Sequence, residues 1–355
     1  MRNTSYITAL RFPLALLVVF IHSYNSVWRG IETGSFPTLP YFCSRILPTF
    51  AVPLFFAISG YLFFLNVKKM DWATYSNKLK RRFFTLLIPY LLWNLLAFGL
   101  YALKDLAAHQ SLSFPLSPDL LWGCRVLGTE HTNLLGWTVL GSTTPVLEPF
   151  WFVRDLLVIV LCSPLIYLLV HKLRLSGLLL IGAAYYLELW PNFGGITLLG
   201  FWYFALGAWF SLTNRDVIHT TRWVAFPAWI LMFPLAAFIT LYPDFEPAVR
   251  IPAQHIYVLC GMMVMCHLAN LYTLMRKPGK FLAQSSFFLY AAHTIVLLPL
   301  STLVARLATE ESSIDQASYF LLLPFGATVL CLLGYRLISR VVPRYHFVLT
   351  GVKEK

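Results

Sequence analysis

Long apolar runs separated by short polar segments follow one another along the whole chain. A helix that crosses a bilayer needs about 20 predominantly apolar residues. Ten runs approach that length, at residues 7–27, 48–67, 83–103, 150–170, 175–191, 195–212, 223–242, 251–272, 281–306 and 318–339. The pattern predicts an all-α polytopic membrane protein with about ten transmembrane helices. Because so many spans leave little room for a soluble domain, we expect one membrane domain over residues 1–355.

The composition favours the same class. Hydrophobic residues make up 58% of the 355 positions and charged residues 12%, whereas soluble domains carry roughly 45–50% apolar and about 25% charged residues. The first apolar run contains Arg11 and lacks a small-residue cleavage site, so we expect it to be a span and not a signal peptide.

The basic residues predict the orientation in the membrane. Cytoplasmic loops of membrane proteins are enriched in Lys and Arg. Most of the 27 basic residues fall in alternate connections if both termini are cytoplasmic, whereas only Asp71, Asp216 and Glu354 of the 15 acidic residues fall there. The chain is therefore expected to be N-in/C-in. The formal charge of +12 then reflects this orientation, and nucleic acid is not an expected partner.

One connection, at about 104–149, is much longer than the others and is predicted to be external. It contains Trp122, His131, Trp137 and Glu148, and we expect it to fold back onto the membrane face. Cys43 and Cys124 both fall in predicted external segments, where a disulfide between them is one alternative and two free thiols the other. No metal site is expected, because the His residues in the spans lack carboxylates at ligand spacing.

Two ionisable residues, Arg11 and His22, lie inside the first apolar run. Eleven residues bring a helix back to within about 20° of its starting direction, so both share one face and are separated by about 16 Å along the axis. Ala15 and Val18 lie between them, and Asn25 continues the stripe and is a candidate to orient the imidazole. Ionisable residues within spans are functional candidates. The structural alternative is that Arg11 extends to the headgroups and His22 makes a packing contact.

These residues carry a resemblance to a known family. Arg11 and His22 form the R-x10-H pattern typical of the acyltransferase-3 family of integral-membrane O-acyltransferases, of the bacterial surface-polysaccharide O-acetyltransferase type. Further segments resemble that family's motifs in the family order, namely VPLFFAISGY at 52–61, RR and IPY within 81–90, FWFVRDL at 150–156 and LYAAH at 289–293. Phe12 and Thr85 depart from the family pattern.

The resemblance implies transfer of an acyl group, most often acetyl, from cytoplasmic acyl-coenzyme A to a hydroxyl of a cell-surface or lipid-linked glycan. The expected location is a bacterial inner membrane, with acyl-coenzyme A as a co-substrate and no permanently bound cofactor. His22 would be the base or a transient acyl carrier, and Arg11 would hold the donor. The cations Lys80, Arg81 and Arg82 would bind the phosphates of coenzyme A.

Other polar residues within or beside the spans are weaker candidates for the substrate path. Each has a structural alternative: helix packing for Ser59 with Gly60, a local ion pair for Arg154 with Asp155, and an interhelical hydrogen bond for His293. The remaining candidates are Trp151 and Glu148, which lie near the predicted outer end of the fourth span.

A transporter of a small solute or lipid-linked sugar is the alternative function, since intramembrane Arg and His residues also suit a carrier. No pair of corresponding broken helices is evident in two halves of the sequence. The acceptor sugar, the acyl group, the choice between base and acyl carrier for His22, and the oligomeric state are left open.

Overall fold

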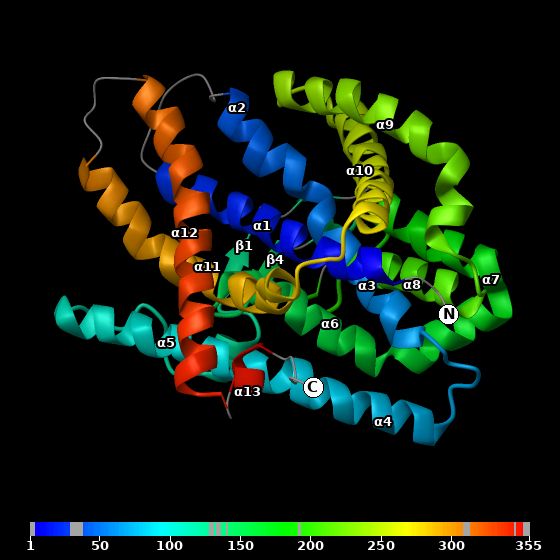
Figure 1. The fold of residues 1–355 in the computed structure, drawn as a ribbon, viewed down its shortest axis with the longest axis horizontal. Helices are drawn as coiled ribbons and strands as arrows, with labels where there is room; N and C mark the ends of the chain where they lie inside the picture. The colour runs from blue at the N-terminus through cyan, green and yellow to red at the C-terminus, as the bar shows by residue number, and fades with distance from the viewer. Residues whose placement is uncertain are drawn as a thin grey trace. The chain divides into compact units, whose positions relative to one another are not determined.

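The computed structural model describes residues 4–28, 38–127, 131–132, 136–139, 141–190, 193–307, 313–343 and 346–350, and most of them are helical (Figure 1). Within these residues, eight segments are long and apolar enough to cross a membrane. They are Ser5–Ser23, Thr38–Phe64, Trp72–Ala107, Ser163–Tyr186, Val217–Leu241, Pro247–Met275, Lys280–Val304 and Leu321–Val341. A shorter apolar helix, α8 (Leu198–Leu212), accompanies them. The predicted all-α polytopic class is confirmed.

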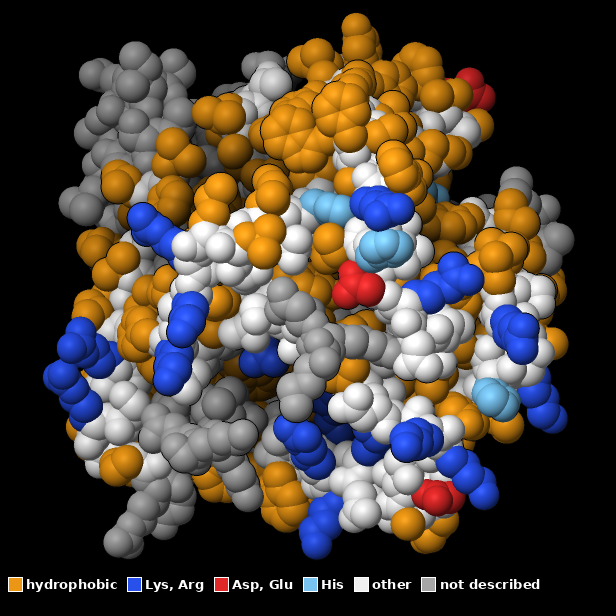
Figure 2. Space-filling view, turned by 45° about the vertical axis from the view of Figure 1, so that its right-hand side comes forward, with side chains coloured by type: hydrophobic (Ala, Val, Ile, Leu, Met, Phe, Trp, Pro, Cys, Tyr) orange, Lys and Arg blue, Asp and Glu red, His pale blue; other side chains and the backbone are white. Residues whose placement is uncertain are grey.

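Hydrophobic side chains cover much of the visible surface (Figure 2). Phe226, Leu180 and Ile230 each expose more than half of their area. A water-soluble monomer rarely exposes extended apolar patches, so this surface suits contact with lipid.

The chain divides into two compact units, one of residues 1–54 and 216–343 and the other of residues 55–215 and 344–355. The first unit contains α1 (Ser5–Trp28), α2 (Thr38–Tyr41), a π-helical turn (Phe42–Ile46), a 3-10 turn (Leu47–Phe50), α9 (Val217–Leu241), α10 (Pro247–Met275), α11 (Lys280–Leu307) and α12 (Ser313–Val341). Helix α1 packs against α10, α11 and α12. Its side chains Leu14, Ala15 and Val19 are fully or almost fully buried, so α1 is the central helix of this unit.

The second unit contains α4 (Trp72–Arg82), a π-helical turn (Phe83–Leu87), α5 (Ile88–Ala107), α6 (Trp151–Leu161), α7 (Ser163–Tyr186), α8 and α13 (His346–Thr350). Helix α3 (Ala51–Phe64) begins in the first unit and continues in the second. It approaches α8 so closely that a Cβ on Gly60 would lie 2.0 Å from the carbonyl oxygen of Phe204, and one on Gly207 1.9 Å from that of Ala57. Because only glycine permits this approach, Gly60 has the packing role considered for the Ser59–Gly60 pair.

The described residues of the long connection between α5 and α6 form two short antiparallel strand pairs and two 3-10 turns. Strand β1 (Arg125–Leu127) pairs with β4 (Ser142–Thr144), placing Arg125 opposite Thr144, and β2 (His131–Thr132) pairs with β3 (Thr138–Val139). The 3-10 turns are Pro118–Leu121 and Glu148–Phe150.

Two side chains of α5 hold this connection in place. The hydroxyl of Tyr90 donates a hydrogen bond to the carbonyl of Leu121, and the buried Asn94 side chain accepts one from the backbone N–H of Leu147 at 3.1 Å. The connection therefore packs against α5, whereas its expected position on the external membrane face stays a prediction.

Two sequence expectations need refinement. The predicted span 150–170 is interrupted, because α6 ends at Leu161 and α7 begins at Ser163. The predicted boundary between residues 170 and 175 coincides with a break in α7 at Arg174, whose φ is 49° and ψ −122°. Cys43 and Cys124 are free thiols, so the disulfide alternative is wrong. The reason at Cys43 is that this residue lies in a π-helical turn within the apolar segment Thr38–Phe64 and not in a loop. The N-in/C-in orientation and the single-domain boundary stay predictions.

Candidate active site

Helix α1 carries the two residues that the sequence placed first. It is α-helical from Ser5 to Trp28, so Arg11 and His22 share a face as expected from their spacing. Ala15 and Val18, between them on that stripe, are only 1% and 2% exposed. The stripe therefore faces the interior of the first unit and not a lipid surface. Arg11 and His22 themselves are half-buried.

The ring of His22 lies beside that of His293 on α11. Their ring centroids are 5.1 Å apart and the planes are tilted by 52°. His293 is completely buried. The two histidines were separate candidates in the sequence, 271 positions apart, and the packing of α1 on α11 brings them together.

A cation that the sequence did not suggest, Arg45, also lies near His22. It belongs to the π-helical turn Phe42–Ile46, and its guanidinium interacts electrostatically with the imidazole. Arg45 falls just before the predicted second span, so nothing in its local pattern marked it. The side chain of Asn25, the other predicted neighbour of His22, lies outside the described residues.

The buried ring of His293 has one engaged and one open nitrogen. Its Nδ1 lies 2.7 Å from the carbonyl oxygen of Tyr290 and 3.2 Å from that of Leu289. Since a carbonyl oxygen only accepts hydrogen bonds, Nδ1 carries the proton and donates it. In the neutral ring Nε2 is then an acceptor. This Nε2 has no hydrogen-bond partner among the described residues.

The half-buried Arg11 differs in its surroundings from Arg154, which is 1% exposed. Among the residues that the structure describes, no hydrogen bond or ion pair to the Arg11 guanidinium is found, although the residue is half-buried within a membrane helix. A cation in that position without a protein partner is suited to bind an anionic or strongly polar ligand group.

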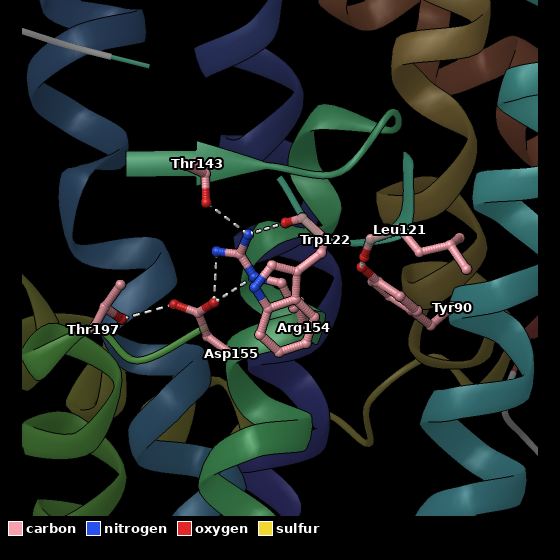
Figure 3. A network of polar contacts seen from close by, with 7 residues as sticks. All are labelled: Tyr90, Leu121, Trp122, Thr143, Arg154, Asp155 and Thr197. Carbon is pink, nitrogen blue, oxygen red and sulfur yellow. Dashed lines mark hydrogen bonds and ion pairs between the residues drawn. The ribbon is translucent and has the colours of Figure 1, made fainter. Parts of the chain in front are cut away.

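Arg154 and Asp155, at the start of α6, lie in a closed network (Figure 3). The two side chains are 1% and 0% exposed and form an ion pair, with Nη2 of Arg154 2.9 Å from Oδ1 of Asp155. Arg154 also donates to the carbonyl of Trp122 and, at 3.2 Å, to the hydroxyl of Thr143. The hydroxyl of Thr197 donates to Oδ2 of Asp155 at 2.8 Å. The local ion pair considered in the sequence is therefore present.

This network connects three segments of the second unit. Trp122 and Thr143 belong to the α5–α6 connection, and Thr197 precedes α8. The adjoining Gly195 has φ +89°, and a Cβ there would lie 2.7 Å from the Trp122 ring. The buried charges of Arg154 and Asp155 thus have hydrogen-bond partners in the protein, as buried charges require. These bonds hold the α5–α6 connection, the start of α6 and the segment before α8 together.

Of the remaining candidates, Glu148 and Trp151 lie at the start of α6 and Ser59 lies on α3. Glu148 forms a 4.0 Å ion pair with Arg125 of β1. Trp151 is half-buried, with its ring centroid 6.4 Å from that of Phe56 on α3. Ser59, also on α3, is half-buried.

The basic residues Lys80, Arg81 and Arg82 form the last turn of α4. Lys80 and Arg81 are exposed, and the Arg82 guanidinium lies 5.9 Å from the Phe63 ring centroid. A hollow of about 360 Å³ opens at the other end of α4, where the chain turns from α3. Its lining residues are Leu65, Asn66, Val67, Lys68, Lys69, Asp71, Thr74 and Lys78. The hollow thus adds three lysines to the cations predicted for donor binding.

Comparison with known proteins gives two matches. Residues 4–336 match the model of a family described as an acyltransferase domain. The succinoglycan biosynthesis protein ExoH of Rhizobium meliloti (strain 1021) is 28% identical over 359 residues, covering 97% of this chain and 91% of that protein. No solved structure matches this chain significantly.

Proposed function

The chain belongs to the acyltransferase family whose model it matches, and from this premise we propose that it transfers an acyl group, with acetyl as the expected one, from acyl-coenzyme A to a hydroxyl of a polysaccharide or its lipid-linked precursor. The family match confirms the resemblance inferred from the sequence, and it makes the chain a membrane acyltransferase in place of the transporter alternative. The polysaccharide as acceptor is supported by the similarity to a succinoglycan biosynthesis protein.

The observation that carries the proposal is the inward stripe of α1, which presents on one face the imidazole of His22 and the cation of Arg11, for which the described part of the chain supplies no ion-pair partner. An alcohol is a poor nucleophile at neutral pH, and a neutral histidine is suited to accept its proton. In the proposed step, the hydroxyl oxygen bonds to the thioester carbonyl carbon while a ring nitrogen of His22 takes the hydroxyl proton.

Collapse of the resulting tetrahedral intermediate breaks the carbon–sulfur bond. The proton on His22 then passes to the departing coenzyme A sulfur, which leaves the ester and the free thiol as products. Positive charge near the reacting carbonyl stabilises the oxyanion of the intermediate, and the nearness of Arg45 to His22 suits that requirement. Arg11, about 16 Å away along the helix, is assigned to holding the donor.

The phosphates of the donor require a cluster of cations. Phosphate oxygens form charge-assisted hydrogen bonds with Lys and Arg, and the basic turn of α4 supplies Lys80, Arg81 and Arg82. We assign the hollow at the α3–α4 turn to the same task, because Lys68, Lys69 and Lys78 line it. The proposed N-in/C-in orientation places these lysines and arginines in the cytoplasm, where acyl-coenzyme A is made.

The test is transfer of labelled acetyl from acetyl-coenzyme A to cell-surface glycan in isolated membranes. The variant His22→Ala is expected to lower the rate by about 10²–10⁴-fold, the usual contribution of a general base. The matched control is His219→Ala, which removes an exposed imidazole from the first turn of α9 and is expected to leave the rate unchanged. Both variants should elute as folded protein in detergent. Full transfer activity in folded His22→Ala would refute the assignment of His22.

A further inference from the structure

We infer that His293 is a positioning residue for His22: its Nε2 accepts a hydrogen bond from a ring N–H of His22 and so leaves the other His22 nitrogen unprotonated for the acceptor hydroxyl. The inference rests on the proposed function of His22. It adds a second histidine, from a different helix, to the machinery of the same site.

The first step of the argument is the protonation of His293. Its Nδ1 donates to the Tyr290 carbonyl at 2.7 Å, which fixes the proton on Nδ1 and leaves Nε2 of the neutral ring with a lone pair. The fixed bond also restricts rotation of the ring. His293 therefore presents a fixed acceptor, and not a second donor, to its surroundings.

The second step concerns the free energy of an unpaired acceptor. His293 is 0% exposed, and its Nε2 has no partner among the described residues. A buried polar atom without a hydrogen bond costs stability, about 1–3 kcal/mol. If His293 only filled space, an apolar residue of similar size would fill it without the cost of an unpaired buried nitrogen. The presence of a histidine therefore points to a hydrogen-bond partner for Nε2 in the working enzyme.

The third step is proximity. The His22 ring is the one whose centroid lies 5.1 Å from that of His293. At that separation the facing edges of two five-membered rings lie about 3 Å apart, which is hydrogen-bond distance for a His22 rotamer that turns a ring N–H toward His293. A neutral His22 that donates one N–H to Nε2 of His293 has a lone pair and no proton on its other nitrogen, so that nitrogen is the one able to act as the base.

A purely structural role for His293 fits less well. The bonds made by Nδ1 go to Leu289 and Tyr290 of its own helix, so they do not join α11 to a neighbour. The expected interhelical hydrogen bond is therefore not supplied by Nδ1. Nε2 is the nitrogen that remains for a contact with α1.

Two amide variants separate the roles of the two nitrogens. In His293→Gln the side-chain amide occupies the position of Nε2, and its oxygen can accept the bond from His22. In His293→Asn the amide occupies the position of Nδ1, so the bond to Tyr290 is kept and the acceptor is lost. We expect His293→Asn to lower kcat by about 10–100-fold, the usual loss when an orienting partner is removed. His293→Gln should retain kcat within about threefold, and KM for acetyl-coenzyme A should stay unchanged in both.

The reference variants are His22→Ala and the double variant His22→Ala/His293→Asn. Since His293 acts through His22, the double variant should be no slower than His22→Ala alone. The inference is overturned if His293→Asn keeps full kcat, if His293→Gln is the more impaired variant, or if only KM changes. These outcomes leave the proposed function intact when His22→Ala is inactive. An active His22→Ala would instead contradict the proposed function itself.

Discussion

Removing the charge of Asp155 should destabilise the second unit strongly. In Asp155→Asn the side chain keeps its shape, but the Arg154 guanidinium, 1% exposed, loses the carboxylate that accepts bonds from Nε at 3.0 Å and Nη2 at 2.9 Å. Breaking a buried ion pair by neutralising one partner costs about 3–5 kcal/mol, because the other charge stays buried without compensation. We expect a loss of that size in the free energy of unfolding.

Two further variants show whether the loss comes from the unpaired charge. Arg154→Met/Asp155→Leu removes both charges and should lose less stability than Asp155→Asn, since apolar replacement of a whole buried pair is often close to neutral. Thr197→Val removes one hydrogen bond to the carboxylate and should also cost less than Asp155→Asn, about 1.5–3 kcal/mol.

The assay is equilibrium unfolding in mixed micelles, followed by tryptophan fluorescence, with the transfer rate measured on the folded fraction. The reasoning is refuted if Asp155→Asn unfolds within about 1 kcal/mol of the parent protein, a difference typical of exposed pairs. A folded double variant that has lost transfer activity would also contradict it, because it would indicate that Arg154 orients substrate.

Two other predictions follow from particular contacts. Gly207→Ala should destabilise the protein by about 1–3 kcal/mol or more through overpacking, because the new Cβ would lie 1.9 Å from the Ala57 carbonyl oxygen. The control Gly99→Ala should be tolerated, since no atom lies within 4 Å of its new Cβ. Equal unfolding curves for the two variants would contradict the packing role of Gly207. The hydrogen bonds from Thr74 lower the pKa of the Asp71 carboxyl below its usual range, so its stabilisation of the start of α4 is present above the ordinary carboxyl pKa and is lost as pH falls through the lowered value. Backbone hydrogen exchange of α4 in Asp71→Ala should accordingly be faster than in the parent at neutral pH and equal to it in strong acid. A difference that does not change with pH would contradict the stabilisation of the start of α4 by the Asp71 carboxylate.

Hydropathy predicted the helical class well because a segment that crosses a membrane must form its backbone hydrogen bonds internally, as a helix does, and needs a long apolar run. The same rule explains why proline did not end the predicted spans. Pro13, Pro234 and Pro299 lie inside helices. Hydropathy carried less information about short interruptions. It predicted one span at 150–170, where α6 ends at Leu161 and α7 begins at Ser163, although the boundary that it placed after residue 170 coincides with the break at Arg174.

The candidate site was predictable only in its local part. Arg11 and His22 share a face because the helical period fixes it, and the sequence displays that period directly. Arg45 comes close enough to act electrostatically on His22 only through the tertiary packing of a π-helical turn, which no pattern of spacing encodes. Thr197 and Trp122 likewise meet Arg154 only after the loops fold. The pairing of His22 with His293 was hidden for the same reason.

The continuity of α1 limits how this stretch of sequence can change. A single inserted or deleted residue between Arg11 and His22 would turn one of them by about 100° around the helix axis relative to the other, which would move one side chain off the stripe occupied by Ala15 and Val18. Substitutions that preserve side-chain size between them are compatible with the stripe, whereas changes of length are not. We therefore expect the interval of ten residues between Arg11 and His22 to be invariant in length among functional homologues, whereas length changes in the long connection between α5 and α6 are expected to be tolerated outside the segments that contact Arg154, Tyr90 and Asn94.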